Sequence, residues 1–175
     1  MFLLEGIGYL ANGNATQRKA YGVLTAFRLF ELLQPFQPVL AGTIPLAIDI
    51  PGSDLDIICC WDDEAAFAEY ATRHFGHFPD FECLHKSIRN RPTVLVRFTA
   101  GGFPIEIFGQ NRPAAEQEAV RHLLVEYAIL QEKGEVFRQA VIDLKRQGMK
   151  TEPAFGRLLG MADGDVYEQL LALMK

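Results

Sequence analysis

The chain has 175 residues, of which 49% are hydrophobic and 22% are charged, and its formal net charge is −5. These values are typical of one globular domain and exclude a disordered chain or a coiled coil. The negative charge also disfavours a long nucleic acid as a partner, because such binding requires many Lys and Arg side chains at phosphates.

The first predicted element is a helix at residues 16–33, where apolar side chains recur at helical spacing. Asn14 or Thr16 is the expected cap, and Pro35 follows its end. Strand and helix signals then alternate. Apolar runs at 38–42 and 54–61 are typical of strands.

A helix at 62–75 separates the second strand from the segment at 81–88. The next signal is a hairpin at 93–109, in which two strand-like runs flank Gly101-Gly102. A two-residue loop places Ala100 opposite Phe103, and therefore Arg97 opposite Glu106. The same register gathers six apolar side chains on one face: Val94, Val96, Phe98, Phe103, Ile105 and Ile107. We therefore expect Glu106 on the more polar face, with Arg97, Leu95 and Phe108.

Beyond Pro113 the pattern is helical, and glycines separate four candidate helices at 114–134, 135–148, 151–160 and 163–174. Their apolar stripes are most simply packing surfaces. Together the elements predict an α/β (α+β) fold, a small mixed sheet flanked by helices with a helical C-terminal half. Because no linker or repeat divides the sequence, we expect a single domain over 1–175. Its sheet-containing core would span about 1–112 and its helical extension about 113–175.

The three cysteines are odd in number and two are adjacent, so they support neither a disulfide framework nor a zinc site. The first residues lack the basic region of a secretory signal, and no apolar stretch approaches the roughly 18 to 20 residues that span a bilayer. We therefore expect a cytoplasmic protein without a membrane segment.

Asp54 and Asp56 stand one residue apart at the start of the second strand. On a strand both carboxylates project from one face, where they repel each other beside an apolar core. A divalent cation would compensate this charge, and oxygen ligands suit Mg²⁺ or Mn²⁺. Glu106, on a neighbouring strand, would add a third carboxylate and allow two ions.

These residues carry a resemblance. Gly42-Thr43, then Asp54-Leu55-Asp56-Ile57, then Ile105-Glu106-Ile107 resembles the nucleotidyltransferase superfamily of DNA polymerase β type. The stretches NGN, GSDLDII, EIFGQ and KTEPAF are similar to an uncharacterised bacterial family within it, over nearly the whole chain. That narrower likeness implies a fold but no substrate.

The superfamily resemblance implies an in-line transfer of a nucleoside monophosphate from an NTP, with ATP expected, to a hydroxyl of a small molecule or protein. Asp54, Asp56 and Glu106 would hold two Mg²⁺ or Mn²⁺ ions and act as the catalytic residues. Gly42 and Thr43 would contact the triphosphate. Two further residues complete the expected nucleotide-binding set: Ser53 and Arg97.

Other interpretations of these residues remain open. Asp54 could be a turn residue, and Glu106 could form an ion pair with Arg97 across the hairpin. The whole protein could be an inactive nucleotide-binding or protein-interaction module. His122 is expected to be a partly buried, hydrogen-bonded helix residue. Three basic residues could contact a triphosphate or form a solvated loop, and the solvated loop is expected: Lys86, Arg89 and Arg91.

Overall fold

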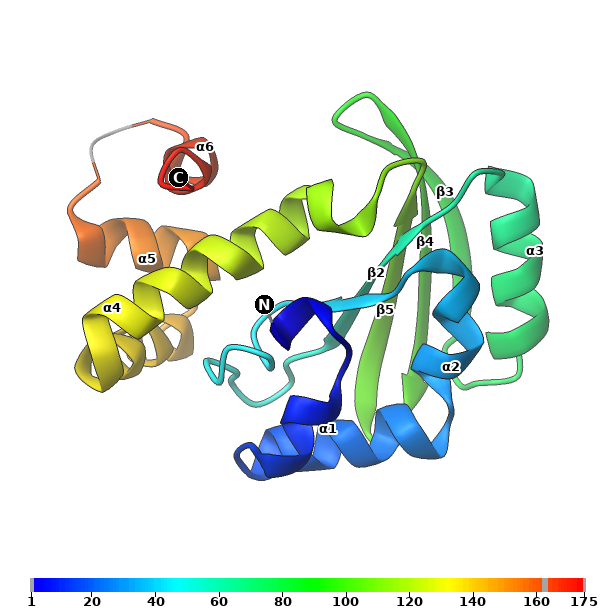
Figure 1. Cartoon of the computed structure of the whole chain (residues 1–175), viewed down its shortest axis with the longest axis horizontal. Helices are drawn as coiled ribbons and strands as arrows, with labels where there is room; N and C mark the ends of the chain where they lie inside the picture. The colour runs from blue at the N-terminus through cyan, green and yellow to red at the C-terminus, as the bar shows by residue number, and fades with distance from the viewer. Residues whose placement is uncertain (1, 162–163, 175) are drawn as a thin grey trace.

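The computed structural model describes residues 2–161 and 164–174. Its five strands form one mixed sheet in the order β1-β2-β5-β4-β3 (Figure 1). The strands are β1 (Val39–Ala41), β2 (Leu55–Cys60), β3 (Glu82–Ile88), β4 (Arg91–Ala100) and β5 (Phe103–Gln110). Only β2 and β5 pair in parallel, and the other neighbours within this described sheet are antiparallel. The predicted mixed α/β fold is confirmed.

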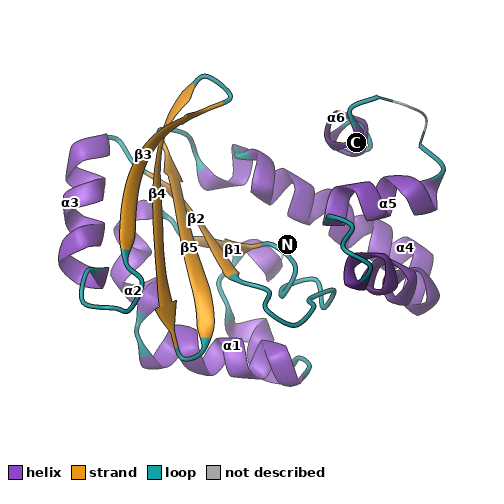
Figure 2. Ribbon diagram, turned by 180° about the vertical axis from the view of Figure 1, so that it is seen from behind, coloured by secondary structure: helices purple, strands orange, loops and turns teal. Residues whose placement is uncertain are grey.

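The helices divide between the two sides of the sheet. They are α1 (Ala15–Ala26), α2 (Leu29–Leu33), α3 (Glu64–Phe75), α4 (Glu118–Arg146), α5 (Thr151–Leu159) and α6 (Val166–Leu171). Short 3₁₀ helices lie at Phe2–Leu4, Gly8–Asn12, Gln34–Phe36 and Ala114–Glu116. Figure 2 shows α3 on one side of the sheet and α4, α5 and α6 on the other. Within the described part of the chain, no helix combines the length and the apolar character needed to cross a bilayer.

The predicted helix at 16–33 is two helices rather than one. Asn14 caps α1 and forms a reciprocal capping box with Gln17, as one of the two expected caps. The continuous helix is wrong at Arg28, whose φ of 55° lies in the left-handed region and interrupts the helical hydrogen bonds. The break turns Leu29 and Leu33 into the core, where both are fully buried.

The hairpin register is confirmed. Ala100 pairs with Phe103 and Arg97 pairs with Glu106, and both loop glycines have the positive φ that a tight hairpin turn requires. All six side chains predicted on the apolar face are buried. This face packs against α1, α2 and α3 in the sheet core, leaving the face with Glu106 for the other side.

The C-terminal helices enclose a second core with residues of the β1–β2 connection. Within α4, Gly134 has φ 75° and ψ −167°, so two helical segments meet there at a kink. This agrees with the two helices predicted on either side of Gly134. Since that backbone conformation is nearly restricted to glycine, the reversal of the chain depends on this residue.

Gly134→Ala should therefore lower the free energy of unfolding by about 1–3 kcal/mol, because a side chain is strained at this φ and ψ. Urea denaturation measures the change. Gly22→Ala is the matched control, since Gly22 lies inside α1 with open space around an added Cβ. It should stabilise by about 0.5–1 kcal/mol. An unchanged or higher midpoint for Gly134→Ala would contradict the assignment of strain to this position.

Candidate active site

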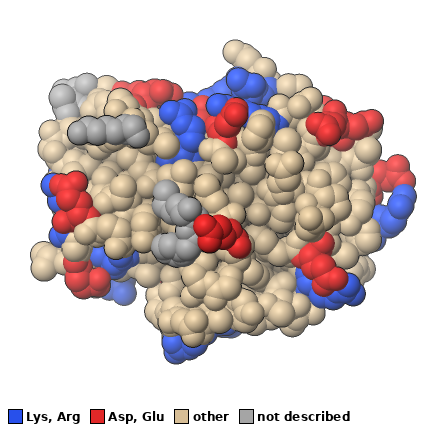
Figure 3. Space-filling model, in the orientation of Figure 1, with Lys and Arg blue, Asp and Glu red and all other residues tan. Residues whose placement is uncertain are grey.

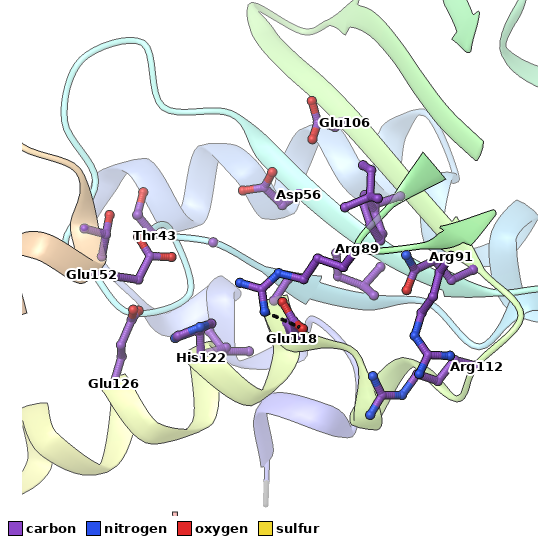
Figure 4. A pocket seen from close by; sticks show the side chains of 18 residues that line it. Thr43, Asp56, Arg89, Arg91, Glu106, Arg112, Glu118, His122, Glu126 and Glu152 are labelled. Atoms are coloured by element: carbon purple, nitrogen blue, oxygen red, sulfur yellow. Dashed lines mark ion pairs between the residues drawn. The ribbon is translucent and has the colours of Figure 1, made fainter. Parts of the chain in front are cut away.

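A cavity of about 360 Å³ lies between the polar face of the sheet and the helices α4 and α5 (Figure 4). The sheet contributes Asp56 and Glu106 to its wall, and α4 and α5 contribute His122, Glu126 and Glu152. The C-terminal helices were expected only to pack. They do so through their apolar side chains, but their polar side chains form the second wall of this cavity.

Asp56 and Glu106 face each other on the parallel strands β2 and β5. Residues opposite each other on paired strands have Cβ atoms about 5 Å apart. Burial first, and then the charges of Asp54, Glu106 and Glu152, together raise the pKa of the Asp56 carboxyl to about 7, against a smaller lowering by Lys145. Without a cation, Asp56 of the folded protein therefore keeps its proton up to about pH 7, where an ordinary aspartate is ionised.

Gly42 directly follows β1, whose last residue, Ala41, pairs with Asp56, and it has φ 75°. A Cβ atom added to Gly42 would lie 2.1 Å from Oδ2 of Asp56, a separation that no real contact allows. The glycine therefore makes room for the carboxylate as well as for the turn. This close approach was not part of the sequence prediction, which assigned Gly42 to the phosphates.

The β1–β2 connection, residues 42–54, is fastened between the two cores. Ile44 is buried in the sheet core, whereas Leu46 and Ile48 are buried in the helical core. Side chains of α1 and α4 donate hydrogen bonds to its carbonyls: Gln17 to Ile44 (2.9 Å) and Pro45 (3.2 Å), Arg138 to Leu46, and Lys145 to Ile48 (2.8 Å). Buried loop carbonyls require such partners, so this connection has a defined path.

Thr43 and Ser53 stand at the two ends of this connection. Thr43 lines the cavity, and its hydroxyl lies 3.4 Å from the Ser53 hydroxyl. The Ser53 hydroxyl accepts a hydrogen bond from the backbone N–H of Ile50 (3.0 Å) and so closes the turn before β2. Ser53 itself is not among the residues that line this cavity.

Asp54 lies outside the strand and outside the cavity that Asp56 lines. It precedes β2, which begins at Leu55, and it lines a neighbouring cavity together with Glu106 and Arg97. The expectation that both aspartates lie within the strand is therefore wrong by one residue for Asp54. Its charge still acts on Asp56, as the raised pKa of Asp56 indicates. Glu106 lines both cavities and so connects the two aspartates.

Arg97 forms the ion pair with Glu106 that the hairpin register allows, with Nε 2.8 Å from Oε2. The Arg97 side chain is 47% exposed and the Glu106 side chain 27%. A pair this exposed contributes only about 0–1 kcal/mol to stability. It can therefore exchange for another partner of Glu106 at low cost.

Three arginines also line the cavity: the Arg91 and Arg112 side chains lie together at one end, whereas Arg89 points to Glu118 near His122 (Figure 4). Arg89 forms ion pairs with Glu118 (2.7 Å) and Glu168 (3.0 Å). Arg89 and Arg91 are exposed, as expected, but they also line the cavity. The β3–β4 hairpin curls these residues over the cavity, a long-range contact that the local sequence does not encode.

His122 and Glu126 lie one helical turn apart on α4 and are only 7% and 5% exposed. Among the described residues, neither ring nitrogen of His122 has a hydrogen-bond partner, and neither does Oε1 of Glu126. Burial lowers the pKa of His122 and raises that of Glu126. The expected hydrogen-bonded histidine is therefore wrong: the ring is buried but unpartnered. Glu126 and Glu152 were missed, because only the reversal of the chain after α4 brings Glu152 near them.

The comparisons with known proteins agree with this fold. Residues 22–173 match the family described as "Domain of unknown function (DUF4269)". No curated protein matches the chain. Among solved structures, Cid1 poly(U) polymerase bound to MgGTP is similar, with a TM-score of 0.53 and 16% identity over 73% of this chain and 41% of that chain.

Two further solved structures are similar. GLD-2 in its complex with RNP-8 has a TM-score of 0.52 and 12% identity, over 88% of this chain and 62% of that one. A cytoplasmic RNA terminal U-transferase has a TM-score of 0.51 and 15% identity, over 82% and 43%. The chain thus spans between 41% and 62% of these three proteins. It shares the fold of these nucleotidyltransferases.

The raised pKa of Asp56 predicts a pH dependence of stability in the metal-free protein. The folded state holds this proton more tightly than the unfolded chain, so its contribution is full below about pH 4 and is lost as pH rises through about 7. Asp56→Asn mimics the protonated form. In EDTA, it should therefore gain stability relative to wild type between pH 5 and pH 8, by about 2–3 kcal/mol.

Urea unfolding of both proteins at the two pH values measures this gain. Asp62→Asn is the control, because Asp62 is an exposed residue just beyond β2 that does not line the cavity. A difference between wild type and Asp56→Asn that stays constant with pH would show that burial and the neighbouring carboxylates do not raise the pKa of Asp56.

Proposed function

We propose that this chain, which belongs to the DUF4269 family, is a metal-dependent nucleotidyltransferase. It would transfer a nucleoside monophosphate from an NTP to a hydroxyl of a small molecule or a protein. The observation that carries the proposal is the pairing of Asp56 with Glu106 across β2 and β5, beside a glycine that admits the Asp56 carboxylate. Glycine, paired aspartates and a third acidic strand residue follow in the order of the superfamily motif.

The carboxylates fit divalent ions. Asp56 is crowded by like charges, and oxygen donors of this kind suit Mg²⁺ or Mn²⁺. We assign two ions to Asp54, Asp56 and Glu106, with Glu106 between the aspartates because it lines both cavities. When bound, such ions lower the pKa of an attacking hydroxyl and neutralise charge on the leaving pyrophosphate.

The chain's own residues would hold the nucleotide. Gly42 and Thr43 offer the backbone and a hydroxyl at the cavity wall, and Ser53 fixes the turn that presents Asp54. Arg97, released from its weak pair with Glu106, would contact a phosphate. Arg91 and Arg112, at the opposite end of the cavity, would attract the same anionic ligand.

In the proposed reaction, the acceptor oxygen attacks the α-phosphorus of the NTP. A bond forms between that oxygen and phosphorus, and the bond from phosphorus to the bridging oxygen of the β-phosphate breaks. Pyrophosphate leaves with this electron pair, and the acceptor proton passes to solvent. Positioning and charge stabilisation supply most of the rate enhancement in such transfers.

A compact acceptor fits the protein better than a long nucleic acid. The net charge is −5, and on the face seen in Figure 3 basic and acidic side chains are interspersed. Binding along a polyanion requires a basic surface instead. Poly(U) polymerase and RNA terminal U-transferase, by their names, act on RNA, but this chain spans only part of the length of those enzymes.

Saturating Mg²⁺ and the correct NTP should stabilise the protein, by about 2.7 kcal/mol at a ligand concentration of 100 times Kd. Asp56→Asn should abolish this nucleotide-dependent shift in Tm. Incubation with each α-labelled NTP and a cell extract should yield a labelled acceptor, and Glu106→Gln should lower that labelling by about 100-fold or more.

Glu69→Gln is the matched control, because Glu69 is an exposed residue of α3, on the opposite side of the sheet, paired only with Arg73 among the residues described. It should leave both the shift in Tm and the labelling unchanged. A shift in Tm without labelling would indicate a nucleotide-binding module instead of an enzyme. No shift with any of the four NTPs would overturn the proposal.

A further inference from the structure

We propose that His122, Glu126 and Glu152 form a separate cation site, which takes a transition-metal ion such as Mn²⁺, Fe²⁺ or Zn²⁺. The nucleotidyl-transfer proposal assigns no role to these residues. They lie across the cavity from Glu106, and they come from α4 and α5 instead of the sheet (Figure 4).

Geometry is the first support for this site. One potential ligand atom from each of the three residues lies within 4.8 Å of the other two. Nitrogen and oxygen ligands bind zinc at about 2.0–2.2 Å, so two ligands on opposite sides of an ion stand about 4 Å apart. Small side-chain rotations would therefore close the three groups around one ion. His122 and Glu126 already share one face of α4, because they are four residues apart.

The second, independent support is the lack of partners. His122 and Glu126 are more than nine-tenths buried, yet both ring nitrogens and Oε1 of Glu126 lack a hydrogen-bond partner among the residues described. Leaving buried polar atoms unpaired is unfavourable, because each such group loses its hydrogen bonds to water without replacement. A cation held by the histidine and both carboxylates would satisfy all three side chains at once.

The neighbouring groups do not already fill this role. The rings of Tyr167 and His122 pack in a T-shaped arrangement, with centroids 5.8 Å apart, and this contact gives neither ring nitrogen of His122 a hydrogen-bond partner among the described residues. The positive charge of Lys145 acts to lower the pKa of Glu126, but the Lys145 ammonium group donates its hydrogen bond to the Ile48 carbonyl. No ion pair within 4 Å joins Glu126 to a base in the described chain.

The ligand set determines the class of ion. Mg²⁺ prefers oxygen ligands, whereas an imidazole favours transition metals. Three protein ligands also leave coordination positions open, as in catalytic metal sites. Because all three residues line the cavity, these positions would face a bound ligand. The ion is therefore placed to contact the acceptor or the nucleotide, unlike a buried structural ion.

The test is the binding of Mn²⁺ to the full chain without nucleotide, followed by electron paramagnetic resonance. We expect bound Mn²⁺ to show coupling to an imidazole nitrogen. The double variant Asp56→Asn and Glu106→Gln should keep this signal, because it disrupts only the proposed transfer site. Excess Mg²⁺ should not remove the signal. This measurement uses no nucleotide, so its result does not depend on whether the protein catalyses nucleotidyl transfer.

Glu152→Gln should weaken Mn²⁺ binding at this site by about 10-fold or more, since even outer-shell changes at metal sites have effects of this size. His122→Ala should remove the nitrogen coupling. Glu118→Gln is the matched control, because Glu118 lies one turn before His122 on the same cavity wall but is paired with Arg89. This variant should keep both the Mn²⁺ affinity and the nitrogen coupling. Loss of the signal in the double variant, its absence from wild type, or equal affinity in Glu152→Gln would overturn the site.

Discussion

The parallel pairing of β2 with β5 is the contact on which the rest of the site depends. It sets Asp56 beside Glu106 on the sheet face that α1, α2 and α3 leave free. Parallel neighbours are joined by long connections, so these two carboxylates come from segments 50 residues apart in the chain. Their repulsion is a property of the fold, and together with burial it raises the pKa of Asp56.

The β1–β2 connection joins the sheet to the C-terminal helices. Its apolar side chains reach both cores, and its carbonyls accept hydrogen bonds from Gln17, Arg138 and Lys145. One end presents Gly42 and Thr43 to the cavity, and the other presents Asp54 to the neighbouring cavity. The sheet and the C-terminal helices therefore line one cavity together.

Local patterns predicted the sheet side of this site well, because its geometry follows from short-range rules. The Gly101-Gly102 turn determines the pairing of Arg97 with Glu106, and strand periodicity places Asp56 on the polar face. The helical side could not be predicted in this way. Glu152 lies near His122 and Glu126 only because the chain reverses at Gly134 and again before α5. Arg89 lines the cavity only because the β3–β4 hairpin bends toward it. The sequence around His122 also could not predict that its ring is buried without a hydrogen-bond partner among the described residues.

The most direct test of the central assignment is a crystal structure with Mn²⁺ and a non-hydrolysable NTP, in which anomalous scattering locates the ions. We predict Mn²⁺ between the carboxylates of Asp56 and Glu106, the triphosphate against Gly42 and Thr43, and Arg97 turned from Glu106 toward a phosphate. Glu106 still paired with Arg97, with no ion at Asp56 and the nucleotide bound elsewhere, would contradict the account.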